Sequence, residues 1–421
     1  MFKLSMILML MVFVFPAKIS AVIWEDTRSW TVADEEKFSA WMQSPAVNET
    51  MFTDSNSRYY GVNTDCADTA YAFRAIFAFE NGLPFAITNP SGSRSGKTMN
   101  NRQTNYDYLG TPEKKLIKFI TDIGESVGTE NLAIYDTYPA AIKKVAPGSL
   151  FMYKIKARFG RFIRHAYNVK NINAVGTFDV IYSTQANKEK RLPLIRRKER
   201  EFENLPSSPW GFRKFRWPEH LGANISSIPS ELGASMEQYQ LAEQLGEKEF
   251  FKYVRKAVAT TNENNAERLV RSLKAACQES IARIDYVNQA LSHLQQTGFA
   301  CMDYADFDAY STPARDKALA DMYEKVQASY KDAKNAGELN LVPSNLLSLV
   351  EEVLDVGFFS SEGDSPELMQ YCTIEYKPGT KISMRTLYKR IKRDDLSSHP
   401  NDSIDVRWGD KGKKTNCKRW Y

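Results

Sequence analysis

Cys66 and His165 are the two residues whose types could together carry out nucleophilic catalysis. Cys66 opens a stretch, residues 65–81, in which apolar residues recur at helical spacing. A cysteine in the first turn of a helix lies near backbone N–H groups and the positive end of the helix dipole, and both favour the nucleophilic thiolate. His165 begins a predicted strand and would accept the thiol proton. The pair predicts acyl transfer through a cysteine nucleophile.

A third polar group is needed to hold the histidine ring in one orientation. Asp179, on a strand predicted over residues 177–182, is the first candidate. Ser183 or Gln185 is the alternative, because a shift of one residue in register exchanges the two faces of a strand. Asp65, directly before the nucleophile, is expected to cap the helix rather than to react.

The elements that must position these residues can be read from periodicity and from turn residues. Gly82 and Pro84 end the helix that Cys66 opens, Pro147-Gly148 forms a turn before a strand, and Gly176 joins two strands as a hairpin. From Met236 onward the pattern is helical. The expected helices are 32–43, 65–81, 114–128, an apolar stripe over 269–294, 313–334 and 343–356, and the expected strands are 149–155, 165–175 and 177–182.

This order of motifs resembles the papain-like cysteine peptidases, nearest to the NlpC-type cell-wall peptidases, over residues 55–185. Asp65-Cys66 matches the Asp-Cys pair that opens the family's helix, and Pro147-Gly148-Ser149-Leu150 partly matches its Pro-Gly-Asp-Leu turn. His165 begins a strand, as the family's histidine does. The resemblance implies an α+β, papain-like domain with an antiparallel sheet. It also implies that a tyrosine upstream of the nucleophile, Tyr60 or Tyr59, assists the oxyanion site.

The function implied by this resemblance is cleavage of amide bonds in the cell envelope, with peptidoglycan stem peptides as substrate. Two other functions are compatible with the same residues. His165-Ala166-Tyr167 is similar to the His-Ala-Trp of transglutaminase-like folds, in which an amine resolves the thioester. Alternatively, the chain is a non-catalytic protein that binds the envelope or cell wall and keeps a vestigial site.

The first residues have the pattern of a secretory signal. Lys3 precedes an apolar run, residues 4–15, and Ala21 ends the segment, so residues 1–21 are expected to be removed on export to the periplasm or beyond the cell. No later stretch is long and apolar enough to predict a membrane span. No metal-ligand spacing, phosphate loop or dinucleotide fingerprint is present, so neither a metal nor a cofactor is predicted.

The cysteine count agrees with export into an oxidising compartment. Of the five cysteines, four are expected to form disulfides, which leaves Cys66 as the free thiol. The simplest pairing joins neighbours in the sequence, although four cysteines allow three pairings. The disulfide cysteines would be Cys277, Cys301, Cys372 and Cys417.

A basic and aromatic loop, residues 188–217, holds most of the excess positive charge. It has ten Lys or Arg and four Glu, a net charge of +6 against +5 for the whole chain. In an exported protein this composition favours contact with an anionic wall or glycan over nucleic acid, and packing between domains is the alternative. The chain is therefore divided into the signal, a papain-like domain over 22–225 that includes this loop, and a mostly α-helical, disulfide-stapled domain over 226–421.

Overall fold

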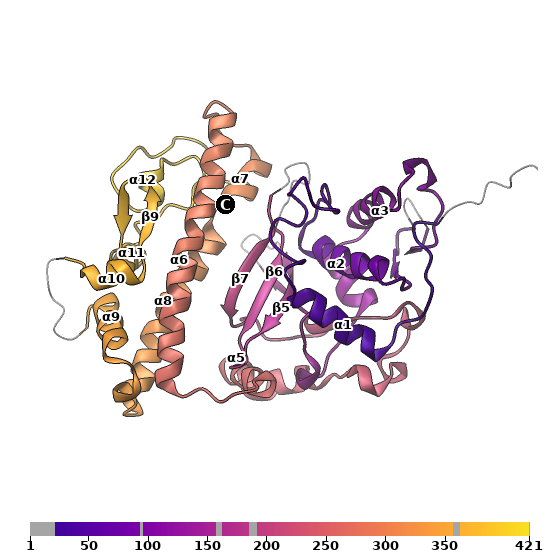
Figure 1. Ribbon diagram of the computed structural model, residues 1–421, viewed down its shortest axis with the longest axis horizontal. Helices are drawn as coiled ribbons and strands as arrows, with labels where there is room; N and C mark the ends of the chain where they lie inside the picture. Colours follow the sequence, from indigo (N-terminus) through magenta and orange to yellow (C-terminus); the bar gives the residue numbers. More distant parts are fainter. Residues whose placement is uncertain (1–21, 93–95, 157–161, 185–191, 357–362, 421) are drawn as a thin grey trace, which may run out of the picture.

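The computed structural model of the chain describes residues 22–92, 96–156, 162–184, 192–356 and 363–420. The predicted signal, residues 1–21, lies outside these ranges. Figure 1 shows two halves: a sheet with helices α1 to α3, and a helical half built on the long helices α6 and α8. The predicted class, mixed helix and antiparallel strand followed by a helical C-terminal region, is confirmed.

The first half is built around a six-stranded antiparallel sheet in the order β3-β8-β4-β5-β6-β7. Helices α1 and α2 begin as the sequence predicts, each with an oxygen-bearing cap, Thr31 and Asp65 respectively. The elements of this half are α1 (Val32–Gln43), α2 (Cys66–Glu80), β1 (Ala86–Thr88), β2 (Thr98–Asn100), α3 (Pro112–Ser126), α4 (Thr129–Asn131), β3 (Thr137–Pro139), β4 (Leu150–Lys156), β5 (Phe162–Ile172), β6 (Phe178–Tyr182), β7 (Ile195–Arg200), β8 (Gly211–Phe215) and α5 (Glu237–Val258).

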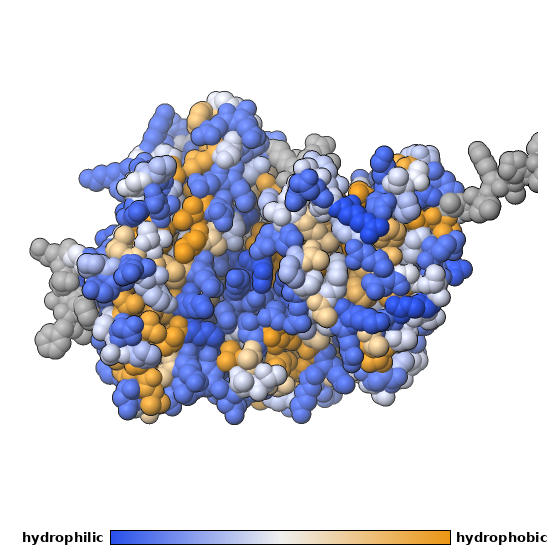
Figure 2. All heavy atoms as spheres, in the orientation of Figure 1, coloured by the Kyte–Doolittle hydropathy of each residue, from blue (hydrophilic) through white to orange (hydrophobic). Residues whose placement is uncertain are grey.

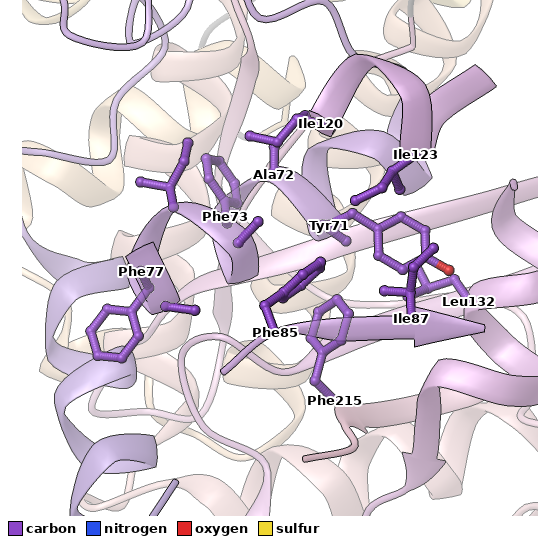
Figure 3. Packing of buried hydrophobic residues seen from close by; sticks show 14 of the residues in the cluster. Tyr71, Ala72, Phe73, Phe77, Phe85, Ile87, Ile120, Ile123, Leu132 and Phe215 are labelled. Atoms are coloured by element: carbon purple, nitrogen blue, oxygen red, sulfur yellow. The ribbon is translucent and has the colours of Figure 1, made fainter. Parts of the chain in front are cut away.

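Each face of the sheet has its own hydrophobic core. One face packs on α2 through Met152, Ala166 and Ile181, within the cluster whose centre is drawn in Figure 3. The other face packs on α5 through a second cluster that contains Phe151 and Tyr182. Because successive side chains of a strand point to opposite faces, neighbouring residues of β4, β5 and β6 belong to different cores.

The helical half has its own core around α6 and α8. Helix α6 follows the capping box that Asn264 and Glu267 form, and one apolar stripe of the helix packs on α8. The elements of this half are α6 (Asn265–Gln296), α7 (Tyr304–Tyr310), α8 (Pro313–Asn335), α9 (Ser344–Leu354), α10 (Pro366–Tyr371), β9 (Ile374–Lys377), β10 (Thr380–Ile382), α11 (Met384–Lys392) and α12 (Ile404–Arg407).

The boundary between the halves differs from the predicted position near residue 225. Helix α5 packs Ala242, Phe250 and Val254 into the core of the sheet, so it belongs to the first half. The chain crosses to the second half between the end of α5 at Val258 and the start of α6 at Asn265. The shift arises because the amphipathic pattern of α5 shows that it is a helix but not on which body it packs.

All four predicted disulfide cysteines are paired, but not with their neighbours in the sequence. Cys277 bonds to Cys372, with Cα atoms 5.9 Å apart, and Cys301 bonds to Cys417, with Cα atoms 5.4 Å apart. Cys277 lies within α6, about 28 Å before its end, so the few residues after the helix cannot return Cys301 to it. The simplest pairing, between neighbours in the sequence, is therefore not the one that forms. Cys66 is the free cysteine, as expected.

Two disulfides are consistent with export. Among the helices that the structure describes, none combines the length and apolar character that a bilayer crossing requires.

Candidate functional site

Cys66 is the first residue of α2, where the sequence places it. The Asp65 carboxylate accepts hydrogen bonds from the backbone N–H groups of Ala67 and Asp68 at 2.9 and 3.0 Å, so Asp65 caps the helix.

The turn before β4 depends on Gly148, which has φ +88° and approaches the ring of Phe38 closely. A side chain at this glycine would clash with that ring.

The surroundings of the Cys66 thiol favour the neutral form. The thiol is buried, and its side-chain partner among the described residues is the Thr129 hydroxyl, with Sγ and Oγ1 3.5 Å apart. Burial, followed by the negative charge of Asp65, raises the pKa of the Cys66 thiol to about 12. The expected thiolate is therefore not favoured, because desolvation of the sulfur outweighs its position at the helix N-terminus.

His165 is the fourth residue of β5 rather than its first, and it lies within a group of tyrosines. The centroid of its ring is 4.5 Å from that of Tyr167, 5.0 Å from Tyr182 and 5.8 Å from Tyr153. Burial, with the nearby charges of Arg200 and Arg197, lowers the pKa of His165 to about 3. The imidazole is therefore neutral in the folded protein at physiological pH.

Cys66 and His165 lie on opposite faces of the sheet. Ala166, the next residue in β5, packs in the same core as Cys66, so the side chain of His165 points the other way. Tyr182, which contacts the His165 ring, belongs to the core of the far face. The predicted pairing of Cys66 with His165 is therefore not formed. A prediction that His165 begins a strand does not say which face its side chain takes.

Two of the candidates for the third residue, Asp179 and Ser183, do not reach His165. Asp179 accepts hydrogen bonds from Asn173 at 3.1 Å and from the backbone N–H of Glu199 at 3.2 Å, and it pairs with Arg196 at 3.4 Å. Ser183 donates to the carbonyl of Thr64 at 2.7 Å. Both residues alternate with Tyr182 along the strand and so face away from the histidine. Gln185 lies outside the described residues.

Of the two tyrosines proposed for the oxyanion site, Tyr59 lies elsewhere. The hydroxyl of Tyr59 donates to Glu80, at the far end of α2 and about 20 Å along the helix from Cys66. Tyr60 has an exposed side chain, with 44% of its area accessible. The assignment of Tyr59 to the oxyanion site is wrong, since its hydroxyl is held at the opposite end of the helix.

Near the thiol lies a charged group that sequence reasoning missed. Glu130, next to Thr129, pairs with Lys154 at 3.1 Å and with Arg164 at 3.0 Å across the hairpin of β4 and β5. Lys154 and Arg164 are direct cross-strand partners on the face of Cys66. The signal in the sequence that could have revealed this charged group is a pair of basic residues at directly opposite positions of two neighbouring strands.

The aromatic part of the basic loop is not a binding platform. Trp210, Phe212, Phe215 and Trp217 are buried, and the Arg213 guanidinium donates to Thr137 within the fold. The predicted contact of these residues with a wall or glycan is replaced by packing within the first half. Part of the loop, residues 188–191, lies outside the described residues. The remaining charged residues lie on β7, on β8 and in the segments next to these strands.

A polar groove runs between β7 and α6 and was not predicted. One pocket of ≈660 Å³ is lined by Lys198, Arg271 and Lys274 among others, and a second of ≈600 Å³ by Glu49 and Asp285 among others. Arg196 lines both pockets and so joins them. Figure 2 shows hydrophilic side chains gathered where the two halves meet.

The groove depends on two elements that are distant in the sequence. Strand β7 is the last strand of the sheet, and α6 turns a polar stripe towards it while packing its apolar stripe on α8. Arg197 of β7 and Glu279 of α6 join the two walls with an ion pair of 2.6 Å. Within the described ranges, no cluster of His, Cys, Asp and Glu is arranged to hold a metal ion.

Comparison with known proteins found no match to the chain among family models, curated proteins or solved structures.

Proposed function

We propose that the protein is a non-catalytic binding protein of the cell envelope, and that its ligand lies in the groove between β7 and α6. The observation that carries the proposal is the placement of Cys66 and His165 on opposite faces of one sheet. Acyl transfer through a cysteine requires a thiolate and a base within hydrogen-bond reach. Here the thiol is held neutral and its side-chain partner is Thr129.

The groove has the features of a binding site. Each pocket has a volume within the usual range for ligand sites, and the groove lies between two bodies, where such sites commonly occur. Its walls carry charged side chains of both signs, so it favours a polar ligand. An alternative site on the basic and aromatic loop is not supported, because the aromatic side chains there are buried.

Co-sedimentation with purified cell-wall sacculi tests the proposal. We expect the wild-type protein to sediment with sacculi without releasing new amino groups. Ala282→Trp, which fills the pocket that Ala282 lines, should abolish sedimentation. Ile281→Trp is the matched control, because its side chain is exposed on the same helix. Equal sedimentation of Ala282→Trp and the wild type would contradict the assignment of the groove.

A cysteine hydrolase acting on amide bonds of the envelope is the second candidate. One observation favours it: the single free cysteine is the first residue of a capped helix, while the other four are in disulfides. Release of amino groups from sacculi by the wild type, lost in Cys66→Ala, would establish this function. Incorporation of an added amine without release would select acyl transfer to amines instead.

A further inference from the structure

The groove between β7 and α6 has opposite free charges at its two ends. At one end, Lys198 and Lys274 are exposed and have no ion-pair partner among the described residues. The carboxylates that share this pocket are already engaged. Asp179 pairs with Arg196, Glu199 with Arg271, and Glu267 with the backbone of Asn264 in the helix cap. The charge available to a ligand at this end is therefore positive.

The other end of the groove is negative by the same reasoning. Glu49 and Asp285 line the second pocket, and within the described ranges neither carboxylate forms an ion pair. The arginine that lines this pocket is engaged elsewhere, since Arg196 pairs with Asp179, and the ring of His293 lies against Asp306 with Nε2 3.1 Å from the carboxylate. The charge available to a ligand at this end is negative.

On each wall of the groove, a carboxylate lies at one end and a lysine at the other, and the two separations are similar. On α6, Lys274 and Asp285 are eleven residues apart, which places them on one face and about 16 Å apart along the axis. On the strand wall, Glu49 lies beside Leu194, whose N–H donates to its carbonyl at 2.8 Å. Lys198 is four residues further on, about 13 Å along β7. Each wall therefore runs from a carboxylate to a lysine.

We infer that the groove binds an extended peptide of about five residues with a free amino terminus and a free carboxyl terminus. An extended chain rises about 3.3 Å per residue, so five residues span the distance between the charged ends. The ammonium group would lie at Glu49 and Asp285, and the carboxylate at Lys198 and Lys274. This inference rests on the proposed function and names its ligand class.

Calorimetric titration with peptides of alternating glycine and serine tests the inference. Peptides of three, five, seven and nine residues are compared, each with free or capped termini. We expect affinity to rise from three to five residues and then to level off. Acetylation of the amino terminus or amidation of the carboxyl terminus should each weaken binding of the five-residue peptide by roughly threefold or more, as expected for a partly exposed ion pair.

Two variants test which end of the groove binds each terminus of the peptide. In Glu49→Gln/Asp285→Asn, acetylation should no longer change the affinity, and in Lys198→Gln/Lys274→Gln, amidation should no longer change it. Lys331→Gln and Asp394→Asn, at exposed positions outside the groove, should behave as the wild type. No binding at millimolar peptide, or capping effects that persist in both groove variants, would overturn the inference. Sedimentation with sacculi that Ala282→Trp abolishes would then still support the proposed function.

Discussion

Arg197 of β7 and Glu279 of α6 form an ion pair that ties the sheet to the helical half. The two side chains are 5% and 11% exposed, with Nη1 and Oε1 2.6 Å apart, and Arg197 Nε donates to the Tyr182 hydroxyl at 2.9 Å. An ion pair at this depth fixes the relative position of its two elements, because separating the partners leaves charges without compensation. It thereby also sets the spacing of the groove walls.

Replacing Arg197 by methionine is expected to destabilise the protein strongly. Glu279 would remain buried without its partner, and such a loss costs about 3–5 kcal/mol. Urea unfolding followed by fluorescence measures the change. The double variant Arg197→Met/Glu279→Met removes both charges and should recover much of the loss. A loss below about 1 kcal/mol for the single variant would show that the pair is accessible to water.

The stability of the folded protein should fall in acid because the unfolded chain takes up a proton at His165. The folded pKa of about 3 lies below the ordinary histidine value, so the unfolded chain binds a proton that the folded protein does not. The contribution is fully present above pH 6.5 and is lost as the pH falls towards 3. Between pH 7 and pH 4 this loss amounts to roughly 3 kcal/mol.

The variant His165→Phe isolates this effect from that of the acidic residues. It keeps an aromatic ring among Tyr153, Tyr167 and Tyr182 but cannot take up a proton. Between pH 7 and pH 4, the unfolding free energy of the wild type should fall by about 3 kcal/mol more than that of the variant. A constant difference would mean that His165 is protonated in the folded state.

The Cys66 thiol should react slowly at neutral pH. With a pKa of about 12, its thiolate fraction at pH 7 is about 10⁻⁵, well below that of an ordinary cysteine. Alkylation by iodoacetamide, measured by mass spectrometry of the oxidised protein, should accelerate only at strongly alkaline pH. His165→Ala should leave the rate unchanged. Fast labelling near pH 7 that slows in His165→Ala would support a catalytic pair and contradict the faces assigned here.

Local signals in the sequence predict the elements of the fold well. Thr31 and Asp65 mark helix starts, and Gly148 and Gly176 mark turns, because capping and positive φ depend on one or two residues. An odd cysteine count predicts that one cysteine stays free, and this cysteine is Cys66. These properties require no knowledge of which elements come into contact.

The site could not be predicted because it depends on register and long-range packing. Ala166, the neighbour of His165 in β5, packs on the face of Cys66, whereas His165 points to the opposite face. A register shift of one residue would exchange the two faces without changing the sequence pattern that predicts the strand. The groove requires α6 to lie along β7, and the polar stripe of α6 has the same pattern as any solvated helix face. Packing of this kind is not encoded in short segments.

The two disulfides should stabilise the helical half by closing long loops. Cys277 and Cys372 are 95 residues apart and Cys301 and Cys417 are 116 apart, so each cross-link removes about 4–5 kcal/mol of chain entropy from the unfolded state. Replacing Cys301 and Cys417 together by serine should lower the unfolding free energy by about 4 kcal/mol. Peptide mapping without reduction checks the pairing, and a peptide linking Cys277 to Cys301 would contradict it, because α6 would then have to be broken.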